Sequence, residues 1–179
     1  MKTRLTKFQG SCIRSINKMT SRKPFNHILV NDKGETVDVT KPIIVSASRS
    51  TDIPAFYADW FFERLRRGYV AWVNPFNQKT MYVSFEKTRM IVFWTKNPEP
   101  IIPYLDELDR LGIHYYFQFT LNDYVNEKLE PGVPPLEKRI GTFKQIAKRI
   151  GKDRVIWRLD PLMISESMPV ESLLEKAMR

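Results

Sequence analysis

The stretch from Ile43 to Leu65 constrains the fold of this chain most, because it combines a strand, a tight polar turn and a helix. The apolar run that opens it is β-branched, which is typical of a strand buried on both faces in a parallel sheet. Thr51 or Asp52 then supplies a helix N-cap ahead of Pro54. In βα folds, ligands bind where the carboxyl end of a strand meets the amino end of a helix. This turn is therefore the first candidate for a functional site.

The same pattern of strand, polar turn and helix recurs downstream. Each further strand is a short apolar run that ends in polar residues or proline, and these strands are predicted at 69–73, 90–94, 113–121 and 154–159. The apolar residues of the predicted helices recur at helical spacing, at 54–65, 99–111, 136–150 and from 169 onward. This order predicts an α/β fold with a parallel sheet, either doubly wound or part of a (β/α)8 barrel.

Alternation within the strand at 113–121 separates the two architectures. Tyr115 and Phe117 belong to an apolar face, whereas Tyr116 and Gln118 belong to a mixed one. A doubly wound sheet needs two apolar faces, so polar residues that increase toward the carboxyl ends favour a barrel mouth. A full barrel takes about 250 residues. We therefore predict a partial (β/α) barrel of about five parallel strands with flanking helices, open rather than closed.

The remaining segments are predicted to lie around this repeat. Residues 27–39 form a small hairpin ribbon, and 79–85 form a short strand outside the repeat. The connection at 122–135 is long for a structural link, and such loops often cover sites. The helix at 136–150 is amphipathic, and its lysines and arginines are expected on a solvated outer face.

The basic excess of the chain, a net charge of +9, belongs mainly to its first 26 residues. This segment holds seven of the 29 Lys and Arg residues and no acidic residue. We predict a disordered basic tail at 1–26 and a barrel domain at 27–179, with nucleic-acid binding by the folded part disfavoured.

The single cysteine, Cys12, excludes an internal disulfide and an all-cysteine metal site. No apolar run is long enough to cross a bilayer, so no membrane partner and a cytoplasmic location are expected.

Polar and charged residues close the predicted strands and should meet at one end of the sheet. Lys96 and Asp160 are the candidate catalytic residues, the first as an amine nucleophile and the second for proton handling. The candidate ligand-binding residues are Arg49, Asp52, Asn74, Gln118 and Arg158. Arg49 and Arg158, together with Lys96, would make a cationic mouth for the phosphate or carboxylate groups of an anionic small molecule. Each residue also has a structural interpretation, such as ordinary turn chemistry at Asn74, and His114 is expected in the core.

Several motifs at these strand ends resemble one family. From Pro42 onward the chain contains, in order, SASRSTDIPAFYADWF, NPFNQ, IVFWTKNP, YYFQFTL, LEPGVPP and VIWRLDP. In this order and spacing they resemble the domain-of-unknown-function family DUF1848. The resemblance implies a partial or complete (β/α) barrel. For full-length members, the resemblance also implies a C-terminal cysteine cluster that is similar to the [4Fe–4S] loop of radical S-adenosylmethionine enzymes. Ser50 and Leu159 depart from the commoner family residues, arginine and tyrosine.

The resemblance identifies the chain as the N-terminal barrel portion of a radical-SAM-like iron–sulfur enzyme, by truncation or a split gene. Such a portion lacks the cluster ligands, so no cofactor is expected in this chain and it should be inactive alone. Its partner would be a missing C-terminal half, or a second copy that pairs with open sheet edges. Two alternatives remain: a self-sufficient Schiff-base barrel enzyme that uses Lys96, and a basic nucleic-acid-binding module.

Overall fold

The computed structural model describes residues 13–15, 27–47, 51–74 and 76–178. Its strands are β1 (Ile13–Ser15), β2 (His27–Val30), β3 (Thr36–Thr40), β4 (Ile44–Ala47), β5 (Tyr69–Val73), β6 (Thr80–Ser84), β7 (Met90–Thr95), β8 (His114–Thr120) and β9 (Val155–Arg158). Its helices are α2 (Ile53–Phe56), α3 (Ala58–Arg66), α4 (Leu105–Arg110), α5 (Leu136–Ile150) and α6 (Val170–Met178), with 3₁₀ turns η2 (Glu99–Tyr104) and η3 (Lys152–Arg154).

The main sheet has the strand order β1-β4-β7-β8-β9. Strands β4, β7, β8 and β9 are parallel, and β1 pairs antiparallel with β4. The chain is therefore a mixed α/β protein with a parallel sheet and flanking helices, as the alternation of strands and helices predicts. The parallel strands form an open sheet, and the described residues do not close it into a barrel.

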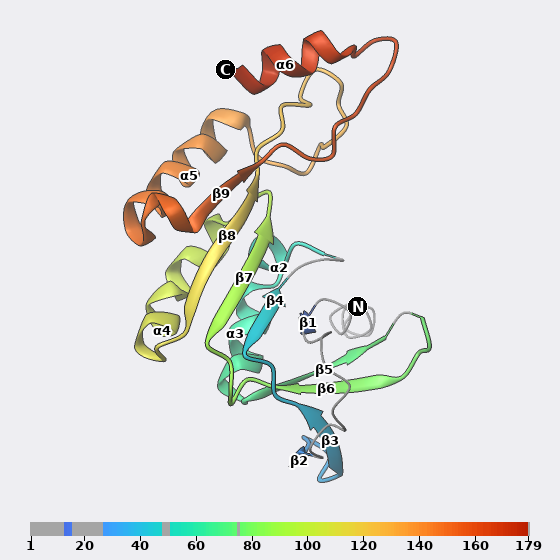
Figure 1. Cartoon of the computed structure of the whole chain (residues 1–179), viewed down its shortest axis with the longest axis vertical. Helices are drawn as coiled ribbons and strands as arrows, with labels where there is room; N and C mark the ends of the chain where they lie inside the picture. Colours follow the sequence, from blue (N-terminus) through green and yellow to red (C-terminus); the bar gives the residue numbers. More distant parts are fainter. Residues whose placement is uncertain (1–12, 16–26, 48–50, 75, 179) are drawn as a thin grey trace.

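The second sheet corrects one prediction, that five strands, including 69–73, lie side by side in parallel. β5 instead pairs antiparallel with β6, in a sheet of order β2-β3-β6-β5. Asn74 and Lys79 join the two strands through the hydrogen bond from Asn74 N–H to Lys79 O, 2.9 Å long. A hairpin closes a short loop, which costs less chain entropy than a crossover. The β5–β6 hairpin projects away from the parallel sheet (Figure 1).

Helices α2 to α5 pack on one face of the parallel sheet, and this arrangement builds the core (Figure 1). Alternate strand residues such as Ile91, Phe93 and Phe117 are fully buried there, against Phe61 of α3 and Ile146 of α5. The period-2 alternation predicted for β8 is observed, because Tyr115, Phe117 and Phe119 are buried whereas Tyr116 and Gln118 are half-buried. The mixed set therefore lies on the face opposite to helices α2 to α5.

Several local predictions are confirmed, and others are refined. The ribbon at 27–39 is the β2–β3 hairpin, and 79–85 contains β6 outside the parallel sheet. The predicted helix at 54–65 is two helices, α2 and α3, separated at Tyr57. Of the predicted basic tail, Ile13–Ser15 form β1 on the edge of β4, whereas the other tail residues lie outside the described residues. Within the described part of the chain, no helix has the length and apolar character needed to span a bilayer.

Candidate functional site

The parallel strands end at one edge of the sheet, and four of the predicted site residues lie at that edge. Lys96 directly follows β7, Arg158 ends β9, and Asp160 follows it by two residues. Gln118, in β8, is paired in register with Trp94 of β7. The structure thus brings Lys96, Gln118, Arg158 and Asp160 to the carboxyl ends of adjacent strands, where α/β folds bind ligands.

Arg158 forms the best-defined contacts of this group. Its Nε and Nη2 donate to the two carboxylate oxygens of Asp160 over 2.9 and 2.8 Å, a bidentate pair. The guanidinium also lies 4.4 Å from the ring centroid of Trp94, at cation–π distance. Trp94 is positioned in turn by β4, because its Nε1 donates to Ser46 Oγ over 3.1 Å. Arg158 is therefore held in one orientation with part of its surface exposed.

Lys96 forms the second ion pair of the group, with Glu130. Glu130 belongs to the connection 122–135, which lies beyond the carboxyl ends of β8 and β9 together with α6 (Figure 1). Both side chains are partly buried, 28% and 20% exposed, so solvent screens this pair less than a surface pair. Lys96 is also close enough to Asp160 to help lower the pKa of that carboxyl. The two ion pairs lie at the ends of β7 and β9, the strands on either side of β8 in the sheet.

Two helices anchor the connection that carries Glu130. Arg139 of α5 is 2% exposed, and it donates to the carbonyl oxygens of Asn122 over 2.6 Å and Pro134 over 2.8 Å. Lys176 of α6 donates to Asp123 O over 2.6 Å, near the start of the connection. The prediction that the basic residues of α5 all face solvent is wrong for Arg139, because its guanidinium satisfies buried carbonyl groups.

Asp52 has a positioning role in the structure. Its Oδ1 accepts from the Ala55 N–H over 3.0 Å, which is the predicted N-cap of α2. Its Oδ2 accepts from Thr95 Oγ1 over 3.0 Å and from the Lys96 N–H over 2.7 Å. Asp52 therefore ties the β4–α2 turn to the end of β7 and sets the backbone from which Lys96 projects.

The two aspartates of the site should titrate in opposite directions from the ordinary value of 3.8. Burial raises the pKa of Asp52, whereas hydrogen bonds from Arg158 lower the pKa of Asp160. The contribution of Asp52 to the free energy of unfolding therefore decreases as pH rises from 3.8 through its raised native pKa. The contribution of Asp160 to the free energy of unfolding is present at higher pH and is lost as pH falls through its lowered native pKa. Carboxyl ¹³C NMR titration measures both midpoints, and a midpoint for Asp52 below that of Asp160 would contradict the site geometry.

One sequence candidate, Asn74, is not part of this group, and the position of another, Arg49, is not described. Asn74 directly follows β5 of the other sheet, and its Oδ1 accepts from the Phe76 N–H over 3.0 Å. It therefore has the ordinary turn chemistry of its structural interpretation. Arg49 lies outside the described residues. His114 is exposed at the start of β8, which corrects the prediction that it lies in the core. Sequence reasoning also did not identify Glu130 as a site residue, although the length of its connection and the LEPGVPP motif are signals that point to it.

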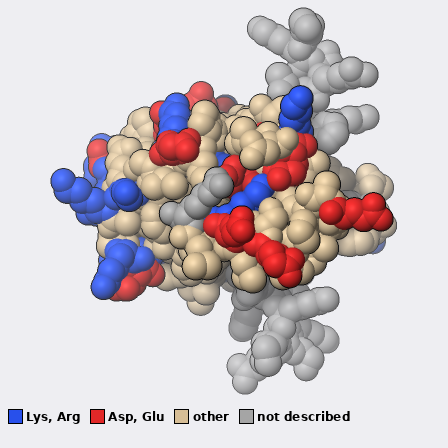
Figure 2. Space-filling view, turned by 90° about the horizontal axis from the view of Figure 1, so that it is seen from above, with Lys and Arg blue, Asp and Glu red and all other residues tan. Residues whose placement is uncertain are grey.

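The charge of this end of the molecule is mixed. Seen from above, Lys and Arg atoms near the centre of the face are bordered by Asp and Glu (Figure 2). The cations Lys96 and Arg158 each have a carboxylate partner, so they do not form an unscreened positive patch. An anion that binds here must therefore compete with Glu130 and Asp160.

Comparison with known proteins places these residues inside one family region. The family model of a domain of unknown function, DUF1848, matches residues 44–179. No curated protein and no solved structure matches the chain.

Proposed function

The chain belongs to the DUF1848 family of domains of unknown function, and from this membership we propose that it forms the N-terminal barrel portion of a radical-SAM-like enzyme. Its four parallel strands and helix-covered outer face support a partial barrel. The carboxyl ends of those strands would then form part of the mouth. The reaction class itself rests on the family resemblance.

The residues of this chain do not fit a [4Fe–4S] cluster. Cluster ligation needs several thiolates, and the chain has one cysteine, Cys12. Among the described residues, no group of three or more His, Cys, Asp or Glu side chains could hold a metal ion. The role proposed for this chain is therefore ligand binding at the substrate or S-adenosylmethionine side of the mouth.

The proposal rests mainly on the two cations at the strand ends, Lys96 and Arg158, each of which is paired with a carboxylate. Arg158 presents a planar donor surface over Trp94, which suits a phosphate or carboxylate group. The proposed ligand is a small anionic molecule that displaces the intramolecular carboxylates from these cations. Bound anion would perturb the Trp94 ring, so tryptophan fluorescence offers a direct signal.

Pyrophosphate and malonate are suitable probes, titrated at constant ionic strength with tryptophan fluorescence as the readout. We expect saturable binding of at least one of them. Glu130→Gln should tighten that binding by about threefold or more, because it removes the carboxylate that competes for Lys96. Glu137→Gln, an exposed substitution on α5, is the matched control and should leave the affinity unchanged. Weaker anion binding by Glu130→Gln, or no saturation by either probe, would contradict the proposal.

The free edge of the parallel sheet supports the proposed partner, a C-terminal half or a second copy. β9 is the last strand in the sheet order, and Ile156 and Trp157 on it are 43% and 49% exposed. β1 already covers the opposite edge at β4, so association should use the β9 side only. Sedimentation velocity should show concentration-dependent association that Trp157→Lys reduces. A monomer at all concentrations would contradict this expectation.

Specific contacts favour this proposal over its alternatives. A Schiff-base lysine reacts as the neutral amine, whereas Lys96 pairs with Glu130 as the charged ammonium. On α5, Arg139 is buried and Arg149 pairs with Asp106 and Asp109, so two of its five cations are not available to a nucleic acid. Both alternatives remain predictions, as does the cytoplasmic location.

A further inference from the structure

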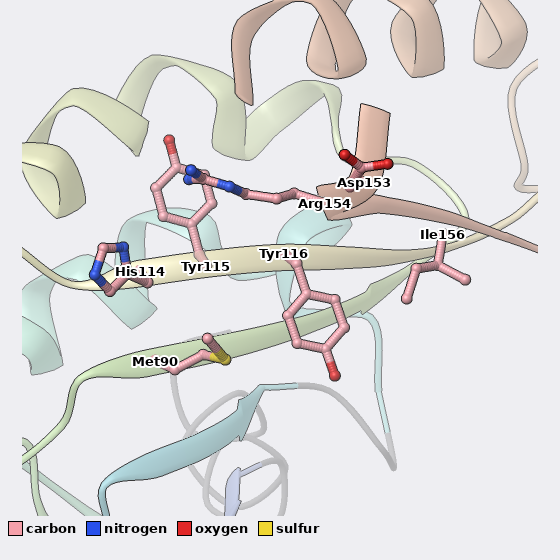
Figure 3. A pocket seen from close by; sticks show the side chains of 7 residues that line it. All are labelled: Met90, His114, Tyr115, Tyr116, Asp153, Arg154 and Ile156. Atoms are coloured by element: carbon pink, nitrogen blue, oxygen red, sulfur yellow. The ribbon is translucent and has the colours of Figure 1, made fainter. Parts of the chain in front are cut away.

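The hollow at the amino ends of the strands does not gather its lining groups on one side of the sheet. It has a volume of about 380 Å³. Met90, Tyr116 and Ile156 project from one side, whereas the Arg154 side chain extends beside Tyr115 on the other side of β8 (Figure 3). One small ligand could not contact both sets of side chains, so this hollow does not form a single site.

Another hollow lies where the helical segment after β4 breaks in two. Tyr57 ends α2 with φ −137° and ψ 27°, outside the helical range, and α3 begins at the next residue. Both helices pack against η2, and Pro100 of η2 lines the hollow together with residues 55–60. The volume is about 300 Å³, at the lower end of the range of small-molecule sites. This hollow can therefore hold a small molecule.

Aromatic side chains dominate the lining of this second hollow. Phe56, Tyr57 and Trp60 all line it. Tyr57 and Trp60 are half-buried and pack against the hydrophobic core, which restricts their movement. Phe56 is 69% exposed, so a ligand that covers it removes apolar surface from water. The faces of aromatic rings carry negative electrostatic potential, so three rings around one hollow favour a cation.

A carboxylate adds to this preference. Asp59 is the charged side chain among the described residues that line the hollow, and it is exposed. Its Oδ1 accepts a hydrogen bond from the Tyr104 hydroxyl, which orients the carboxylate without neutralising its charge. The hydroxyl keeps its proton, because Asp59 raises the pKa of Tyr104. The amino end of α3 offsets about half of the charge of Asp59, so the hollow keeps a net negative charge.

We propose that this hollow binds a small quaternary ammonium group, with the cation against the rings of Phe56, Tyr57 and Trp60 and close to Asp59. A primary ammonium has three hydrogen-bond donors that need acceptors, whereas a quaternary one has none and therefore suits a mainly aromatic lining. The lining residues belong to the helix layer on one face of the sheet. The site therefore goes beyond the function proposed above, and it does not depend on the mouth being a binding site.

Ligand-observed NMR titration of the full chain with choline tests the proposal. The neutral probe is dimethylbutanol, the alcohol of the same shape in which a carbon atom replaces the choline nitrogen. We expect saturable binding of choline, and an affinity for dimethylbutanol that is lower by about fivefold or more. Phe56→Leu should weaken choline binding by about threefold and change dimethylbutanol binding little, because leucine keeps apolar surface but has no ring. Asp59→Asn should weaken the binding of choline alone, by a similar factor of about threefold.

Two substitutions outside the hollow serve as matched controls. Glu63→Gln removes an exposed carboxylate from α3, and Phe76→Leu removes an exposed ring between β5 and β6. Neither control should change the affinity for either probe. Phe56 and Asp59 are exposed, so their variants should keep the fold, and circular dichroism confirms this before titration.

Three results would overturn the proposal. The first is no saturation by choline below about 10 mM, an affinity too weak for a specific site. The second is equal affinity for choline and dimethylbutanol, which would show that the hollow has no preference for a cation. The third is a choline affinity that Phe56→Leu and Asp59→Asn change no more than the control variants do, which would place choline elsewhere on the protein.

Discussion

Arg158→Ala should lower the affinity for the anionic probe by at least about tenfold, because it removes a charged donor of a bidentate pattern. Lys96→Ala should cause a loss of similar size, since both cations lie at the carboxyl ends of the strands. Tryptophan fluorescence titration with pyrophosphate or malonate measures both effects. Arg110→Ala removes a charge from an exposed position on α4 and serves as the matched control.

The fold should survive both substitutions. Arg158 and Lys96 are 29% and 28% exposed in their side chains, and neither belongs to the hydrophobic core. Thr120 Oγ1 also donates to Asp160 Oδ1 over 3.2 Å, so that carboxylate should keep one protein partner in Arg158→Ala. Unchanged affinity in both variants, with a native circular dichroism spectrum, would mean that the anion binds elsewhere.

Arg139→Met should lower the free energy of unfolding by about 3 kcal/mol, the largest stability effect that we expect outside the apolar core. Methionine keeps the aliphatic volume, but it leaves the carbonyl groups of Asn122 and Pro134 buried without their charged donor. Urea denaturation measures the change. Lys138→Met, the neighbouring position on α5, removes only an exposed pair with Glu99 and should cost less than about 1 kcal/mol.

The same substitution should also affect the ligand site, because Arg139 anchors the connection that carries Glu130. Arg139→Met should therefore increase backbone amide hydrogen exchange in residues 122–135 more than in β7 or β8. Equal stability losses at 138 and 139 would show that the buried guanidinium is not a structural anchor. Exchange that rises uniformly over the chain would show that the connection has no separate anchoring.

The helix α5 illustrates what could be predicted from sequence. Its bounds, Leu136–Ile150, coincide with the predicted ones because an amphipathic period over four turns is a strong local signal. The placement of Lys96 and Arg158 at one end of the sheet could also be predicted. Both follow or close strands of the same direction, so geometry determines their end of the sheet once the strands are parallel.

The position of β5 could not be predicted in the same way. Its apolar residues are compatible with either sheet. The choice between a crossover and a hairpin depends on which partner strand can be reached with the smaller loss of chain entropy. The turn residues from Asn74 to Lys79 were the available hairpin signal.

Glu130 and Arg139 illustrate a second limit of sequence reasoning. Each is one charged residue among several nearby, and its partner is selected only when the long connection folds back over the strand ends. Side-chain periodicity carries no information on such loop contacts. The ion pairs of the site therefore required the three-dimensional structure.

We propose one ligand site at the carboxyl ends of β7, β8 and β9. Two-dimensional ¹H–¹⁵N NMR of the full chain, titrated with pyrophosphate or malonate, tests it most directly. We expect the largest shift changes at the Trp94 indole N–H, at the Arg158 Nε–H and at the backbone amides of Lys96 and Gln118. His114 and Tyr116, at the other end of the sheet, should show little change. Changes centred on His114 and Tyr116, with Trp94 and Arg158 unaffected, would show that the anion does not bind at the carboxyl ends of the strands.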